Sequence, residues 1–102
     1  MRSGLTVEQL FVRRLSGRVT FLAVLEAPSG ARRRESVPTP FDAVEPALRY
    51  LVRHFASRGD VEGAGRVRVR EERSGDLVER RDLAAAFRER LARELAGDEA
   101  DA

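Results

Sequence analysis

Arginine supplies the most concentrated polar chemistry in this chain of 102 residues, because all nineteen basic residues are arginine. Two groups stand out, a consecutive triplet and a trio that alternates with valine: Arg32, Arg33, Arg34, Arg66, Arg68 and Arg70. Guanidinium groups bind phosphates and carboxylates bidentately, so a sheet that set the two groups side by side would form a polyanion-binding surface. The alternative is that nearby acids neutralise them in cross-strand pairs, namely Glu35, Glu71, Glu72 and Glu79.

Residues suited to catalysis are scarce. His54 is the only histidine, and no Ser or Asp lies near it at a spacing that defines a proton relay. The absence of cysteine and lysine removes thiolate metal ligands, the lysine of a Walker A loop and Schiff-base chemistry. Glu71 and Glu72 are adjacent, so in a strand they point to opposite faces and cannot share a metal or a proton. We therefore predict a non-enzymatic protein with no catalytic residues, no cofactor and no metal site.

Composition and charge indicate one small globular domain. The chain is 42 % hydrophobic and 35 % charged, and its length suits a single core under a charged surface. No run approaches the roughly 20 apolar residues that cross a bilayer, and no signal-peptide core follows Met1, so we expect a cytoplasmic protein without a membrane segment. The net charge is only +2. We predict a single domain over residues 1–97 and a disordered acidic tail over residues 98–102.

Ser-Gly steps at residues 16–17, 29–30 and 74–75 each separate two segments that favour extended structure. Glycine supplies the positive φ of a tight hairpin and serine tolerates the turn, so the chain is predicted to form successive hairpins. Residues 5–15 are ambiguous, because Thr6 and Gln9 also form a possible capping box ahead of a helical apolar stripe. The recurrence of the Ser-Gly turn favours a strand there.

The other strands differ in their patterns. Residues 18–25 form a nearly continuous apolar run, which is typical of a central strand. Residues 31–37 carry the arginine triplet, which indicates an exposed edge strand. Residues 66–70 alternate strictly between arginine and valine and predict a half-buried strand, followed by a short strand around residues 77–78.

Two amphipathic helices follow from apolar spacing. The first is predicted to begin near Pro40 with Thr39 as its cap, and Pro46 is predicted to kink it or split off its first turn. The second is predicted to begin with Asp82 as its cap. Their apolar faces comprise Phe41, Val44, Leu48, Leu51 and Phe55 in the first and Leu83, Phe87, Leu91 and Leu95 in the second. The glycine-spaced stretch 59–65 between them is predicted to be a loop.

The resulting order is βββαββα, an α+β fold with an antiparallel sheet of four to five strands and two helices on one face. The chain has more apolar residues than one small core needs, and the surplus residues, Leu10, Val12 and Val52, hint at an interface. We therefore expect a non-enzymatic interaction or accessory module that self-associates or joins a larger assembly through its sheet face or edge. Its partner is then a protein, a second copy included. Nucleic-acid or polyanion binding through the six arginines is the alternative.

Overall fold

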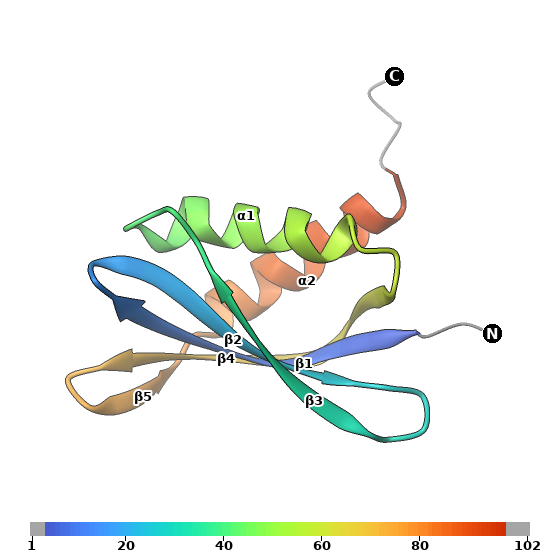
Figure 1. Ribbon diagram of the computed structural model, residues 1–102, viewed down its shortest axis with the longest axis horizontal. Helices are drawn as coiled ribbons and strands as arrows, with labels where there is room; N and C mark the ends of the chain where they lie inside the picture. Colours follow the sequence, from blue (N-terminus) through green and yellow to red (C-terminus); the bar gives the residue numbers. More distant parts are fainter. Residues whose placement is uncertain (1–3, 98–102) are drawn as a thin grey trace.

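A five-stranded mixed sheet carries both helices on one of its faces (Figure 1). The computed structural model describes residues 4–97, so the predicted acidic tail lies outside the described residues. The predicted α+β class, the order βββαββα and the placement of the helices are confirmed. The sheet order is β3-β2-β1-β4-β5. The elements are β1 (Leu5–Leu15), β2 (Arg18–Glu26), β3 (Arg32–Pro38), α1 (Val44–Ala56), β4 (Val61–Arg73), β5 (Asp76–Glu79) and α2 (Arg81–Leu95).

All three Ser-Gly steps lie in hairpin turns, which join β1 to β2, β2 to β3 and β4 to β5. Ser16 and Gly17 have φ values of 53° and 79°, and Ser74 and Gly75 have 51° and 85°. Two successive residues with positive φ match the right-handed twist of the flanking strands, as in a type I′ turn. Residues 5–15 are therefore a strand, and the helical alternative for this segment is wrong.

The expectation of a purely antiparallel sheet is wrong at its centre, where β1 and β4 are parallel. The chain leaves the edge strand β3, crosses the sheet as α1 and returns beside β1, and such a crossover produces a parallel pair. The stretch 59–65, predicted as a loop, contributes the start of β4, with Leu5 opposite Val61 and Thr6 opposite Gly63. The glycines of this stretch do not form a loop, because β1 lies beside them and pairs with their backbone.

Neither helix begins at its predicted cap. Thr39 immediately follows β3, its hydroxyl donates to the Val19 carbonyl at 2.8 Å, and α1 starts at Val44. Pro46 then falls in the first turn, whose N–H groups have no intrahelical acceptor, so it neither kinks nor splits the helix. Asp82 lies in the first turn of α2 and pairs with Arg80 at 2.8 Å instead of capping. No helix within residues 4–97 is long and apolar enough to cross a bilayer.

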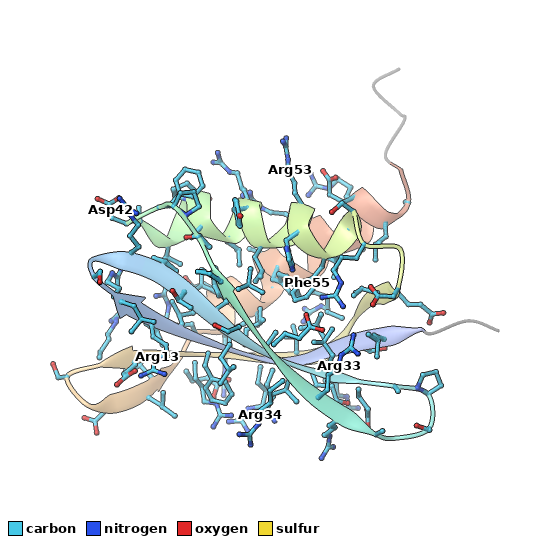
Figure 2. All side chains as sticks on the ribbon, viewed as in Figure 1. Arg13, Arg33, Arg34, Asp42, Arg53 and Phe55 are labelled. Atoms are coloured by element: carbon cyan, nitrogen blue, oxygen red, sulfur yellow. The ribbon has the colours of Figure 1, made fainter. Side chains whose placement is uncertain are left out.

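The core fills the space between the sheet and the helices, where Figure 2 places Phe55. Phe55 and Phe87 meet edge to face there, with ring centroids 6.3 Å apart. Leu10, Val12 and Val52 are at most 3 % exposed. The expectation that these three are surplus to the core is wrong, because β1 is the central strand and two helices share one face of the sheet.

Candidate interaction surface

The face of the sheet opposite the helices, here called the open face, has an apolar centre. Phe11 of β1 lies opposite Leu22 of β2, and Gln9 of β1 lies opposite Val24. These four side chains form the floor of a hollow of about 720 Å³ that β3 borders at residues 32–34, with the Arg32 and Arg34 side chains on the hollow's side of the sheet. We name Phe11, Leu22 and Val24 the apolar centre. It is the part of the sheet that a partner can cover without displacing a helix.

Strand alternation explains why this surface exists. Successive side chains of a strand point to opposite faces, so burial of Leu10 and Val12 under the helices places Phe11 on the open face. The same period in β2 buries Phe21 and Ala23 and turns Leu22 outward. The sequence alone does not assign Phe11 to either face of β1, because Phe11 is as apolar as its neighbours Leu10 and Val12. The correct assignment needed the position of the helices, which decides which side of β1 is covered.

Arg34 projects from the open face away from the helices (Figure 2). Its register partner is Val24 of the apolar centre, and within residues 4–97 it has no hydrogen-bond or ion-pair partner. Arg32 is different, because it lies 3.3 Å from Glu8 and 3.9 Å from Glu26. A hydrogen bond with Glu8 raises the pKa of Glu26, because that bond needs a proton on one of the two neighbouring carboxyls, and the Arg32 charge opposes the shift.

The arginines of β4 border the other side of the apolar centre. Arg70 lies opposite Phe11, and its guanidinium carbon stands 4.6 Å from the centroid of that ring. It donates to the Gln9 side chain at 2.5 Å, whereas its buried Nε has no acceptor among the described residues. An unsatisfied buried donor costs roughly 1–3 kcal/mol. Arg68 pairs with Glu79 at 2.9 Å, and Arg66 is exposed with no partner in residues 4–97.

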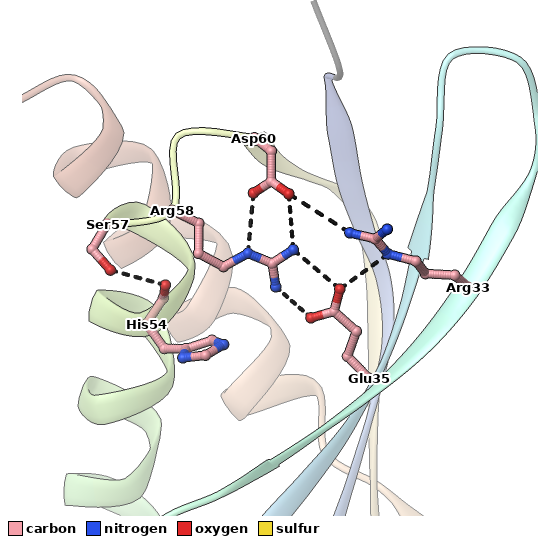
Figure 3. A network of polar contacts seen from close by, with 6 residues as sticks. All are labelled: Arg33, Glu35, His54, Ser57, Arg58 and Asp60. Atoms are coloured by element: carbon pink, nitrogen blue, oxygen red, sulfur yellow. Dashed lines mark hydrogen bonds and ion pairs between the residues drawn. The ribbon is translucent and has the colours of Figure 1, made fainter.

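Arg33 lies on the opposite side of the sheet from Arg34. Its guanidinium contacts Glu35 at 3.1 Å and Asp60 at 3.6 Å (Figure 3). Arg58, at the end of α1, joins the same two carboxylates and approaches Asp60 at 2.9 Å. Hydrogen bonds from Arg58 lower the pKa of both Glu35 and Asp60 and raise the pKa of Arg58. This network fastens α1 to the edge of the sheet, so Arg33 serves the fold.

A second network surrounds Glu71, whose side chain is 3 % exposed. Its carboxylate accepts from Arg14 and from Arg73, each at 3.1 Å, and from Arg80. Burial raises the pKa of Glu71, but the three guanidinium hydrogen bonds outweigh it and the net pKa is lowered. Arg80 immediately precedes α2 and its N–H donates to the Val69 carbonyl at 2.7 Å. The network therefore fixes the start of α2 on β4.

The six predicted arginines do not form one surface. Five point to the open face, in two groups on either side of the apolar centre, and Arg33 points away. Successive side chains of a strand point to opposite faces, so the sequence alone suffices to place Arg33 on the other face from Arg32 and Arg34. Pairing with acids, the alternative to polyanion binding, holds for Arg32, Arg33 and Arg68.

The sole histidine gives no sign of a reactive site. The His54 ring packs edge to face on Phe55, with centroids 5.3 Å apart, and its backbone carbonyl accepts from the Ser57 hydroxyl. Across the described part of the chain, no three His, Asp or Glu side chains are grouped to hold a metal ion.

Comparison with protein-family models, curated proteins and solved structures finds no match to this chain.

Proposed function

We propose that this chain is a non-enzymatic interaction module that binds a protein partner through the open face of its sheet. One observation carries the proposal: Phe11, Leu22 and Val24 form an apolar centre at the middle of a sheet whose other face packs against α1 and α2. Apolar side chains grouped in a hollow with a polar rim are typical of an interface.

The ionisation of the acidic residues supports a non-enzymatic role. A catalytic acid needs a raised pKa, usually in a pocket. Here the pKa values of Glu35, Asp60 and Glu71 are lowered by neighbouring arginines. Glu26, whose pKa is raised by a hydrogen bond with Glu8, lies at the open surface beside Arg32. These carboxylates serve ion pairs.

The proposal is tested by capturing partners from the native host with the full chain and with two variants. Leu22→Ser removes part of the apolar centre, whereas Tyr50→Ser, the control, removes an apolar side chain that is 40 % exposed on α1. We expect a partner, or a second copy detected by light scattering, that Leu22→Ser loses and Tyr50→Ser retains. A strict monomer that captures nothing, or capture that Leu22→Ser leaves intact, would contradict the proposal.

Polyanion binding is the second candidate, and the absence of a carboxylate partner for Arg34 and Arg66 within residues 4–97 favours it. Binding through these arginines would release counterions and weaken steeply as salt is added. Retention on heparin at low salt, lost by Arg34→Gln combined with Arg66→Gln, would support this function. No retention at low salt would exclude it.

A further inference from the structure

We infer that the segment recognised by the open face is both apolar and acidic, with side chains that cover the apolar centre and carboxylates that reach Arg34 on one side and Arg70 on the other. This inference rests on the proposed function. It adds the chemistry of the partner, which the apolar centre alone does not specify.

The charge balance of the open face is the first argument. Four glutamates of this face are engaged by arginine: Glu72 by Arg13 at 3.3 Å, Glu79 by Arg68, and both Glu8 and Glu26 by Arg32. The arginines of this face that lack a carboxylate among the described residues include Arg34, Arg66 and Arg70. The face therefore complements a ligand that brings its own carboxylates.

The arrangement across the strands is the second argument. Arg34 of β3 is followed by Val24 of β2 and Gln9 of β1, and the adjacent row runs from Leu22 through Phe11 to Arg70 of β4. Three strand spacings separate β3 from β4, which is roughly 14 Å. A helix is about 10 Å wide, so one amphipathic helix, or four residues of extended chain, can cover the centre and place a carboxylate at each side.

Arg70 is the third argument, because its present contacts leave it incompletely satisfied. It lies over Phe11, donates to the neutral side chain of Gln9, and holds a buried Nε without an acceptor in the described chain. A ligand carboxylate that draws this guanidinium off the ring would supply the missing acceptor. It would also uncover Phe11 for the apolar side chains of the ligand.

Two other occupants fit this face less well. A second copy would bring its own unpaired Arg34, Arg66 and Arg70 against the same excess of positive charge. A nucleic acid would bring its phosphates against the glutamates of this face, and the apolar centre offers it a single aromatic ring, Phe11, for stacking. An acidic, apolar protein segment matches both the floor and the rim.

The test is selection of a random twelve-residue peptide library on the immobilised full chain. We expect the selected peptides to combine Asp or Glu with Leu, Ile or Phe. The same selection on Arg34→Glu should lose the acidic residues and gain Lys or Arg, a reversal that a purely structural role of Arg34 would not produce.

The best selected peptide is then synthesised and its affinity is measured by calorimetry. Arg34→Gln and Arg70→Gln should each weaken binding about tenfold, the loss of one charge-assisted contact. The control Arg88→Gln, at an exposed position on α2, should leave the affinity unchanged. Circular dichroism verifies that each variant is folded.

The outcomes separate this inference from the proposed function. Peptides without acidic residues, or binding that Arg34→Gln leaves unchanged, would overturn the inference alone, provided that Leu22→Ser still abolishes binding. Binding that ignores Leu22→Ser, or selection that enriches no peptide, would overturn both. Displacement of the peptide by oligouridine at physiological salt would overturn the inference in favour of a nucleic-acid ligand.

Discussion

The two faces of this sheet use the same residue types for opposite purposes. On the covered face, arginine meets buried or half-buried carboxylate at two points, around Glu71 and around Glu35, and each network attaches a helix to the sheet. On the open face, arginines outnumber carboxylates and border an apolar centre that is partly exposed at Phe11 and Leu22 and buried at Val24. The difference teaches that arginine content alone says little about function. What matters is whether a guanidinium already has its carboxylate.

The largest effect on the free energy of unfolding is expected from Phe87 in the core, compared with Phe11 on the open face. Phe87→Ala should lower the free energy of unfolding by about 3–5 kcal/mol, because it leaves a cavity between α2 and the core. Phe11→Ala should cost less than half of that, since Phe11 lies on the open face, yet it should abolish partner binding. Urea unfolding measures both variants. Equal destabilisation would mean that Phe11 is core and would remove the contrast.

Adjacent glutamates give the next contrast. Glu71→Gln should cost about 1.5–3 kcal/mol, because three arginines lose a buried, charged acceptor. Glu72→Gln is the matched control, since Glu72 is 45 % exposed and has a single pair with Arg13, and it should cost less than about 1 kcal/mol. Chemical denaturation of both variants tests the difference. A cost for Glu72→Gln as large as that for Glu71→Gln would refute it.

Low pH should remove the difference in stability between the wild-type chain and Glu71→Gln. The pKa of Glu71 is lower in the folded chain than its ordinary value of 4.5, so its ionisation stabilises the fold above that pH. The contribution is lost as pH falls through the folded pKa. The difference in unfolding free energy between the wild-type chain and Glu71→Gln should thus be constant from about pH 6 to 8 and shrink below 4.5. A difference that does not change with pH would show that the carboxylate acts by shape alone.

The smallest expected effect on stability comes from Arg34. Arg34→Gln should change the free energy of unfolding by no more than about 0.5 kcal/mol, because no partner in residues 4–97 is lost. Arg58→Gln, which breaks the contacts with Glu35 and Asp60, should be clearly destabilising by comparison. Thermal unfolding of the two variants side by side measures this. Destabilisation by Arg34→Gln would imply that the open face also serves the fold.

Local patterns predicted much of the fold. The Ser-Gly turns defined three hairpins, and apolar spacing located both helices, because turns and amphipathic helices depend on residues close in sequence. The parallel pairing of β1 and β4 depends instead on where α1 returns the chain. The start of β4 was missed for the same reason, since Gly63 is extended only because β1 lies beside it.

The surface was predicted in part. The arginines that border it were identified from the sequence, whereas its apolar centre was not, because Phe11 and Leu10 are equally apolar and only the helices decide which is buried. Ion pairing was also left open, since Arg32 and Glu8, or Arg14 and Glu71, come together only through the tertiary fold.

The parallel pair at the centre of the sheet also constrains how the chain folds. Residues of β1 and β4 that meet across it are far apart in sequence, as the contact between Arg14 and Glu71, 57 positions away, shows. Closing so long a loop costs chain entropy before its contacts form, and non-local pairing slows folding. The turns that join β1, β2 and β3 are local, whereas β4 reaches β1 only after the chain has passed through α1, and one side of β1 is an unpaired edge until it does. Docking of the second hairpin with α2 then completes the sheet and closes that edge to other chains.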